Sequence, residues 1–387
     1  MGKTGIETYY TVKDGKKLWF GYTTGTCAAA AAKAATSLLL TGRAGETVHV
    51  LTPKGIPLDL EVLEPWRSED AAGCAVRKYS GDDPDVTDGI LICATARRRA
   101  QPGVLIDGGE GVGRVTEPGL KEPVGEAAIN PVPREMIRLA VEEALDECEQ
   151  LTGVGIVISV PEGAEIAKRT FNPRLGIEGG ISILGTSGIV EPMSEDALLD
   201  SIELEIRQKR ALGQERLILV PGNYGADFAR TFCGVDDARL VKCSNYVGRT
   251  LDMAAAAGFR EVLLIGQVGK LVKLSGGIMN THSREADCRA ELMAAWALRA
   301  GGSAGLAQAI LACVTTDEML RLMEEAGVRK QAMDHMGRQI DFYLRHRVRD
   351  QLAVGAVVFH ETYGPLCATG PAGEWLEELR GQGGPNA

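Results

Sequence analysis

The stretch "RLILVPGNYGADFARTFCG", residues 216–234, decides the fold of the second half of the chain. An apolar run ends in a Pro-Gly turn, and a helix-forming segment that ends at another glycine follows. The same alternation continues through a strand-like segment (239–245), a helical segment (246–258) and a second apolar strand (261–267). Apolar strands that alternate with helices predict a parallel α/β sheet covered on both faces, which is a Rossmann-like region.

The segments outside this region complete the predicted organisation. A long helix is expected over 194–213, and the last ninety or so residues are expected to be mainly helical, with a strand at 354–364 and a disordered Gly/Pro-rich tail. Before residue 190, strands outnumber helices, and the clearest helix is "PREMIRLAVEEALDECEQL", residues 133–151. The predicted strands there cover 47–53, 58–65, 89–98, 103–111 and 153–161. We therefore predict a two-layer α+β domain (1–190) followed by a Rossmann-like three-layer α/β domain (191–387) with a helical C-terminal extension.

Composition narrows the class of protein. A chain of 387 residues with 45% hydrophobic and 24% charged residues fits an ordinary globular protein of two domains. A net charge of -10 argues against nucleic-acid binding. The nine cysteines form no CxxC pair or zinc-like cluster, so we expect reduced thiols and no metal site in the protein. We find no signal-peptide core or membrane-length apolar run and expect a cytoplasmic protein, and a homo-oligomer stays open.

The segment "GYTTGTCAAAAAKAATSLLLTG", residues 21–42, predicts a close-packing helix behind a polar turn. We expect the helix to run from about Thr26 to Thr41, with Thr24 or Thr26 as its N-cap and Gly42 as its C-cap. The free N–H groups at its start, beside threonine hydroxyls, suit a carboxylate. The alternative is a structural helix with an ordinary cap.

Four further loops combine glycine with polar residues. The four aspartates of "KYSGDDPDVTDG" (78–89) could ligate a hard cation, but their spacing fails the EF-hand template. We expect instead carboxylates that face a cationic ligand or remove a proton, although Asp-rich turns are also common between strands. "GISILGTSGIVEPMS" (180–194) is either a ligand-binding junction or a linker. "VPGNYG" (220–225) and the stretch 263–289 follow predicted parallel strands, where nucleotide-like ligands bind. "GQVGK" matches neither the dinucleotide fingerprint nor the P-loop, and His282 in "NTHS" is either a proton relay or structural.

Seven segments together resemble one family. They are "GYTTGTCAAAAAKAA", "KYSGDDPDVTDG", "INPVPREMI", "GISILGTSGIVEPMS", "VPGNYG", "KCSNYVG" and "IGQVGKLVKLSGGIMNTHS". In this order they resemble the cobalt-precorrin-5B C(1)-methyltransferase family of anaerobic cobalamin biosynthesis, over roughly residues 21–364. The resemblance implies S-adenosylmethionine-dependent methylation of C-1 of a cobalt-corrinoid, giving cobalt-precorrin-6A. Cobalt then enters only as part of the substrate.

This chemistry assigns expected roles to residues. The substrate carries many carboxylates, which basic side chains and helix N-termini would bind, while the cationic donor favours carboxylates or carbonyls. For proton transfer we expect His282, Asp85 and Asp88. For substrate binding we expect Thr23, Thr24, Thr26, Lys78, Lys270, Lys273 and Arg284, with Lys242 and Arg249 as further basic candidates. For the donor we expect Gly185, Thr186, Ser187, Glu191, Gly222, Asn223, Gly266 and Gly269.

Two other interpretations stay open at this stage. A nucleotide-dependent kinase or dehydrogenase would use "IGQVGK" and bind ATP or NAD. A non-catalytic tetrapyrrole carrier would bind corrinoids tightly without consuming a methyl donor.

Overall fold

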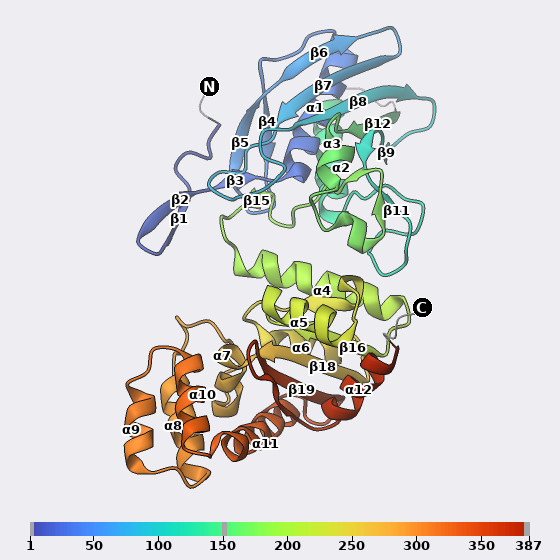
Figure 1. The fold of residues 1–387 in the computed structure, drawn as a ribbon. Coiled ribbons are helices and arrows are strands. Elements are labelled where there is room, and N and C mark those ends of the chain that lie inside the picture. Colours follow the sequence, from blue (N-terminus) through green and yellow to red (C-terminus); the bar gives the residue numbers. More distant parts are fainter. Residues whose placement is uncertain (1–3, 149–152, 383–387) are drawn as a thin grey trace. The chain divides into compact units, whose positions relative to one another are not determined.

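The computed structural model describes residues 4–148 and 153–382 and shows a mixed α/β chain (Figure 1). The chain divides into two compact units, residues 1–195 and 196–387. Each unit has its own sheet of five strands and its own hydrophobic core.

The sheet of the first unit is mostly antiparallel. Its order is β6 (Leu63–Arg67), β7 (Ala71–Arg77), β8 (Leu91–Arg99), β12 (Gly153–Ser159) and β9 (Val104–Gly108). Only the β12–β9 pair is parallel. Alternate residues of β8 are buried, as expected for a strand with one face on the core. The predicted strands of this half are confirmed.

Helix α1 (Thr24–Thr41) lies against β7 and β8 and against α2 (Pro131–Glu147). The five alanines of residues 28–32 are at most 2% exposed, because a methyl side chain lets the helix approach its neighbours closely. Gly42 is the predicted C-cap, with φ 75° and its N–H donating to the Leu38 carbonyl. The N-cap predicted at Thr24 or Thr26 is wrong. Thr23 caps the helix, and its hydroxyl accepts a hydrogen bond from the Thr26 N–H.

Short strands and hairpins surround this layer. They are β1 (Tyr10–Lys13), β2 (Lys16–Trp19), β3 (Gly21–Tyr22), β4 (Thr47–Leu51), β5 (Pro57–Glu61), β10 (Gly111–Val112), β11 (Arg114–Val115), β13 (Ile177–Glu178), β14 (Gly180–Ile181) and β15 (Ile189–Val190), with α3 (Gly163–Ala167) and η1 (Asn172–Leu175). The β3–β15 pair brings the segment before residue 190 beside the start of α1. The predicted helix 133–151 is α2, except that residues 149–151 lie outside the described residues.

The sheet of the second unit has the order β17 (Leu240–Lys242), β16 (Arg216–Val220), β18 (Glu261–Gln267), β19 (Ala353–His360) and β20 (Gly364–Ala368). The first four strands are parallel, as predicted, and β20 adds an antiparallel edge that the sequence analysis missed. Leu217 and Leu219 of β16 pack in one core cluster with α4 (Glu195–Ala211) and α6 (Val247–Ala256). Ile218 and Val220 pack in another with α5 (Asn223–Cys233) and α12 (Ala372–Gln382), so helices cover both faces.

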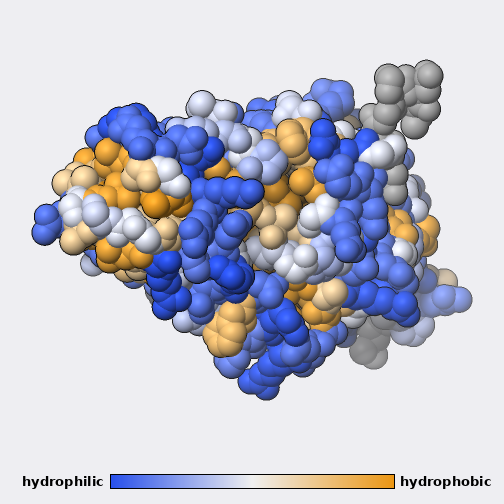
Figure 2. Space-filling view, turned by 60° about the horizontal axis from the view of Figure 1, so that its bottom comes forward, coloured by the Kyte–Doolittle hydropathy of each residue, from blue (hydrophilic) through white to orange (hydrophobic). Residues whose placement is uncertain are grey.

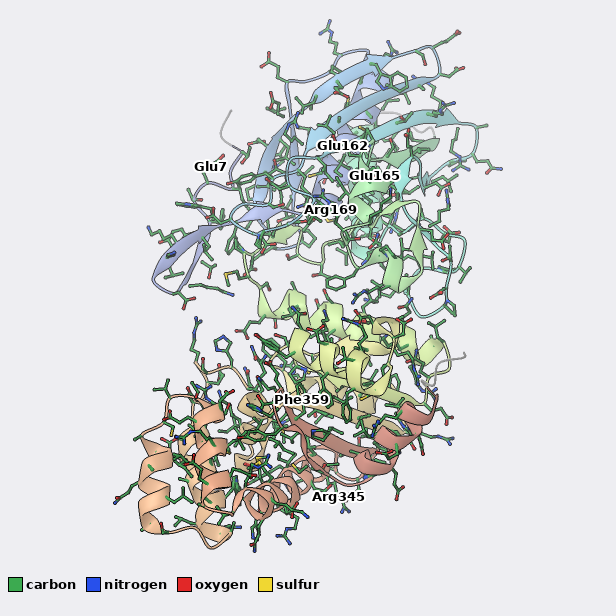
Figure 3. The ribbon with its side chains drawn as sticks, in the orientation of Figure 1. Glu7, Glu162, Glu165, Arg169, Arg345 and Phe359 are labelled. Atoms are coloured by element: carbon green, nitrogen blue, oxygen red, sulfur yellow. The ribbon has the colours of Figure 1, made fainter. Side chains whose placement is uncertain are left out.

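The remaining helices are α7 (Val268–Leu271), η2 (Asp237–Arg239), η3 (Val272–Gly276), α8 (Arg289–Arg299), α9 (Ala304–Leu311), α10 (Thr316–Glu325) and α11 (Arg329–Val348). The prediction of a disordered tail is wrong for α12, because Trp375, Leu376 and Leu379 are buried in the cluster that contains Phe359. The Phe359 ring stacks on Phe228 with centroids 4.0 Å apart; Figure 3 labels Phe359 in the second unit. Residues 383–387 lie outside the described residues.

Candidate functional site

The carboxyl edge of the second sheet contains a topological switch point. The chain passes from β16 through α5 to β17 on one side, and then through α6 to β18 on the other side. The loops after β16 and β18 therefore leave the sheet in different directions. The crevice between two such loops is where open α/β sheets commonly bind ligands. These loops contain Gly222 and Asn223 after β16, and Gly269 and Lys270 after β18.

Lys270 connects the loops at this edge by hydrogen bonds. Its Nζ donates to the Pro221 carbonyl at 2.8 Å and to Asn245 Oδ1 at 3.0 Å, so it links the loops after β16, β17 and β18. The side chain is half-buried, and this burial lowers the pKa of Lys270. The sequence analysis gave Asn245 no role, although the residue lies in "KCSNYVG", one of the segments that carry the family resemblance.

The N-terminus of α5 adds to the positive character of this edge. Gly222 precedes the helix with φ +115°, a conformation that favours glycine, and no side chain caps the first N–H groups. A Cβ at Gly222 would lie 3.9 Å from Lys270 Nζ, so the backbone here approaches the lysine without being in tight contact. Lys242 Nζ donates to Asn223 Oδ1 at 3.0 Å. Two lysines and a helix N-terminus make this edge attractive to anions.

The loop that follows η3 completes the edge. Thr281 N–H donates to the Asn245 carbonyl at 2.9 Å, and Lys273 Nζ donates to the Thr281 carbonyl at 3.1 Å. Lys273 is only 2% exposed, and burial lowers the pKa of its ammonium group. Lys273, predicted to bind substrate, thus holds the loop in place from inside the unit, and we interpret it as a structural residue.

His282 is exposed on that loop, and its tautomer follows from its surroundings. The Arg284 N–H donates to His282 Nδ1 at 3.0 Å, so in the neutral ring the proton lies on Nε2. An Nε2–H group donates a hydrogen bond and does not accept a proton. His282, predicted to accept a proton, presents in this neutral form an Nε2–H group that can donate a hydrogen bond to an anion. Arg284 is exposed beside it.

The two remaining glycines predicted for the donor differ in their surroundings. A Cβ at Gly266 would lie 2.8 Å from Leu271 Cγ, so Gly266 is required for packing and not for ligand approach. A Cβ at Gly269 would lie 3.4 Å from Thr316 Oγ1, an ordinary contact, so the Gly269 backbone stays accessible from the edge.

In the first unit, the threonine hydroxyls of "GYTTGT" are used inside the fold. Thr24 Oγ1 donates to the Leu184 carbonyl and accepts from Leu184 N–H, and Thr26 Oγ1 donates to the Gly188 carbonyl at 2.6 Å. Thr23 caps α1. All three residues are buried. These hydroxyls join α1 to the segment 184–188, so we interpret the three threonines as structural residues and not as the carboxylate ligands predicted from the sequence.

Substituting Thr26 by valine should therefore lower stability and leave substrate affinity unchanged. Loss of the buried hydroxyl removes one hydrogen bond to the Gly188 carbonyl, which costs about 1–2 kcal/mol of unfolding free energy. Urea denaturation measures this effect, and Thr41→Val, at the exposed end of the same helix, is the matched control. A Thr26→Val protein with wild-type stability and weakened substrate binding would restore the original assignment.

The predicted donor segment before residue 192 is also packed within the unit. A Cβ at Gly185 would lie 2.3 Å from Thr23 Oγ1, and Gly185 has φ +133°, so the glycine makes room for the cap of α1. The Ser187 hydroxyl bonds to the backbone of Ile189, and Glu191 forms an ion pair with Lys54. Thr186 is exposed. Gly185, Ser187 and Glu191 are thus satisfied by the fold itself.

The aspartates of residues 82–88 stabilise their own loop. Asp82, Asp83, Asp85 and Asp88 each accept a backbone N–H, from Trp19, Met193, Thr87 and Ser80 respectively. Among the described residues no group of three or more His, Cys, Asp or Glu side chains is placed to hold a metal ion.

Asp85 has a second partner, the buried Lys78. The Lys78 Nζ donates to Asp85 Oδ2 at 2.7 Å, and the lysine side chain is 2% exposed. Burial opposes ionisation of Asp85, but the charge and hydrogen bond of Lys78 outweigh it and lower the pKa of Asp85. Asp85, predicted as a base, and Lys78, predicted as a substrate ligand, thus form an ion pair with each other, which we interpret as structural.

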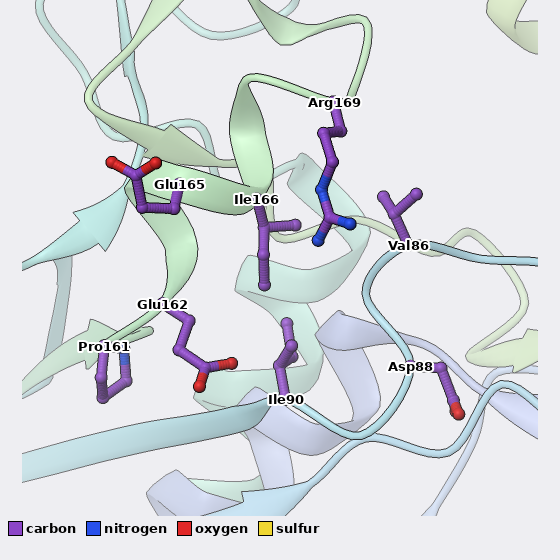
Figure 4. Close-up of a pocket in the computed structure, with 8 residues that line it drawn as sticks. All are labelled: Val86, Asp88, Ile90, Pro161, Glu162, Glu165, Ile166 and Arg169. Carbon is purple, nitrogen blue, oxygen red and sulfur yellow. The ribbon is translucent and has the colours of Figure 1, made fainter.

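A pocket of about 520 Å³ lies beside this loop in the first unit (Figure 4). Its lining comes from the Asp-rich loop and from the segment around α3: Val86, Asp88, Ile90, Pro161, Glu162, Glu165, Ile166 and Arg169. Asp88 is the only one of the predicted site residues in this lining. Glu162 and Arg169 were missed, because they belong to no recognisable motif and the pocket exists only in three dimensions.

No helix in the part of the chain that the structure describes has the length and apolar character needed to cross a membrane. On the face shown in Figure 2, apolar patches alternate with hydrophilic residues.

The second unit thus has a parallel sheet with basic side chains at its carboxyl edge, the place where α/β proteins of this kind commonly bind ligands. Comparison with known proteins is more specific. A family model described as CbiD matches residues 11–192, and one described as the CbiD C-terminal domain matches residues 280–370. The chain belongs to the CbiD family, which confirms the resemblance found in the sequence.

Curated relatives align with this chain over nearly their whole length. The cobalt-precorrin-5B C(1)-methyltransferase of Ruminiclostridium cellulolyticum is 48% identical over 350 residues, which are 90% of this chain and 91% of the relative. The protein of the same name from Alkaliphilus metalliredigens is 45% identical, over 97% of this chain and 98% of the relative. A solved cobalamin biosynthesis protein (cbiD) from Archaeoglobus fulgidus is 30% identical, covering 72% of this chain and 86% of its own, with a TM-score of 0.38.

Proposed function

We propose that this protein transfers a methyl group from S-adenosylmethionine to C-1 of cobalt-precorrin-5B, giving cobalt-precorrin-6A in cobalamin biosynthesis. The observation that carries the proposal is the similarity, at 45–48% identity over at least 90% of both chains, to proteins named for this reaction. In the transfer, an electron pair of the macrocycle forms a bond to the methyl carbon. The methyl–sulfur bond breaks, its electrons stay on sulfur, and S-adenosylhomocysteine leaves.

This chemistry requires binding and orientation more than it requires a reactive side chain. The sulfonium is already activated, so holding the carbon and the methyl group in line and excluding water supply most of the acceleration. No covalent enzyme nucleophile is needed. Cobalt arrives within the substrate and is not a resident metal of the protein.

We propose that the macrocycle's carboxylates bind at the basic edge of the second sheet. Lys270, Lys242 and the N-terminus of α5 supply positive potential there, and His282 supplies an Nε2–H donor. This reassigns Gly222, Asn223 and Gly269, predicted for the donor, to the acceptor. The reason is electrostatic: a donor with a net positive charge is repelled by this edge, whereas a polycarboxylate is attracted to it.

The proposal also includes the architecture and the location of the protein. We interpret the second unit as a Rossmann-like domain (191–387) with a helical extension, and the first as a two-layer α+β domain (1–190). The nine cysteines are all free thiols, which is consistent with a reducing, cytoplasmic environment.

Acceptor-dependent consumption of the donor tests the function. The purified protein is mixed with S-adenosylmethionine, with and without cobalt-precorrin-5B, and S-adenosylhomocysteine is measured. We expect one S-adenosylhomocysteine per corrinoid consumed, and none without acceptor. Tight corrinoid binding without donor consumption would identify a tetrapyrrole carrier instead, and stabilisation of the protein by ATP or NAD would favour the nucleotide-dependent alternative.

A further inference from the structure

The pocket in the first unit combines an apolar floor with charged groups. Ile90 and Ile166 are buried beneath it, at 4% and 5% exposure, and Val86 and Pro161 form apolar walls. Charged side chains surround these groups, as Figure 4 shows for Arg169, Glu162 and Asp88. Glu162, Glu165 and Arg169 all come from the short stretch that contains α3 (Figure 3). The pocket therefore suits a ligand that is part apolar and part ionic.

Two of these charges are available to a ligand. Within the described residues, the Arg169 guanidinium and the Glu162 carboxylate have no hydrogen-bond or ion-pair partner among other side chains. Glu165 is paired with Lys168 at 2.7 Å, and Asp88 accepts from Ser80 N–H at 2.8 Å. The second carboxylate oxygen of Asp88 can accept a further hydrogen bond.

The lining carries a negative charge overall. Three carboxylates face one guanidinium, and the lining stays net negative when the Glu165 partner Lys168 is included. The fitting ligand therefore has one anionic group for Arg169, an excess of cationic groups for Glu162 and Asp88, and an apolar part for the isoleucines. An α-amino acid that carries an additional fixed positive charge meets all three conditions.

We propose that this pocket binds S-adenosylmethionine, the methyl donor. The donor's α-carboxylate pairs with Arg169, its ammonium and sulfonium groups lie near Glu162 and Asp88, and the adenosyl group packs on Ile90 and Ile166. The inference rests on the proposed function, since it assigns the donor of that reaction to a site. It assigns the cationic donor to a pocket whose lining is net negative.

Isothermal titration of the full-length chain tests this assignment. S-Adenosylmethionine is titrated into wild type, Arg169→Met, Glu162→Gln and the matched control Arg174→Met, an exposed arginine of the same unit outside the pocket. We expect Arg169→Met to weaken binding tenfold or more, because an arginine–carboxylate pair is lost, and Arg174→Met to have no effect. Circular dichroism checks that each variant is folded.

The titration is repeated with S-adenosylhomocysteine, which lacks the sulfonium charge. Glu162→Gln should weaken binding of the sulfonium ligand more than that of the thioether, a difference that a general loss of structure would not produce. Wild-type affinity in both Arg169→Met and Glu162→Gln overturns the pocket assignment while leaving the proposed function intact. Failure of the wild-type protein to bind or consume S-adenosylmethionine with acceptor present overturns the proposed function itself.

Discussion

Replacing Asp85 by alanine is expected to lower the free energy of unfolding by about 3–5 kcal/mol. The substitution leaves the Lys78 ammonium, whose side chain is 2% exposed, without its ionic partner. Removing one member of a buried ion pair costs far more than the pair contributes, because the remaining charge stays desolvated. The two Thr87 hydrogen bonds to Asp85 are lost as well. Equilibrium denaturation by urea at neutral pH measures the difference.

Asp82→Ala is the matched control for this experiment. Asp82 lies in the same loop and accepts one backbone N–H at 2.7 Å, but its side chain is exposed and it pairs with no buried cation. We expect a loss of about 1 kcal/mol for this variant. If Asp85→Ala were no more damaging than Asp82→Ala, the structural role of the Lys78–Asp85 pair would be refuted.

The same pair predicts how stability depends on pH. The pKa of Asp85 is lower in the folded protein than its ordinary value of 3.8, so the unfolded state takes up the proton more readily. The stabilisation is fully present above the unfolded-state pKa and is lost as the pH falls through the folded-state pKa. The stability gap between wild type and Asp85→Ala should therefore be constant near neutrality and should narrow below about pH 4. A gap independent of pH down to the acid limit of folding would contradict the ionic explanation.

Replacing Lys270 by methionine is expected to raise the KM for cobalt-precorrin-5B by about 10- to 100-fold, the range of a lost charge-assisted hydrogen bond. The affinity for S-adenosylmethionine should stay unchanged, because the donor is assigned to the other unit. Steady-state kinetics with varied acceptor, and titration with the donor, separate the two effects. Burial lowers the pKa of Lys270, so acceptor binding should begin to weaken at a lower pH than for an exposed lysine.

Two controls accompany the Lys270 variant. Lys330→Met removes an exposed lysine from α11 and should leave the KM unchanged, while Lys270→Arg keeps the positive charge and should retain part of the acceptor affinity. Higher ionic strength should raise the wild-type KM and have less effect on Lys270→Met. An unchanged acceptor KM in Lys270→Met would remove the basic edge from the proposed site.

Much of the fold could be predicted from hydrophobic patterning. Apolar runs such as residues 216–220 and 261–265 are long enough and rich enough in Leu, Ile and Val to identify buried parallel strands. Ile137, Val141 and Ala144 mark the buried face of α2 at helical spacing. Helix α12 was missed, because its Gly/Pro-rich surroundings dominate the composition and its buried face forms only in the folded chain, against β19 and α5.

The site was harder to predict, since a polar residue does not reveal its partner. Thr24 meets Leu184, 160 residues further along the chain, and nothing near Thr24 distinguishes that bond from one to a ligand. The sequence likewise contains opposite charges at Lys78 and Asp85, seven residues apart, but it does not indicate that the two side chains form an ion pair. Conversely, Arg169 and Glu162 belong to no recognisable motif, and they line a pocket only because the folded chain brings the Asp-rich loop beside them.

The position of the transferred methyl group on the product tests directly whether the protein methylates C-1. The wild-type protein is supplied with S-adenosylmethionine carrying a carbon-13-labelled methyl group and with cobalt-precorrin-5B, and the corrinoid product is analysed by NMR. The account predicts one labelled methyl group, attached to C-1 of the macrocycle. Label at another ring position, or a recovered corrinoid without label, would contradict it.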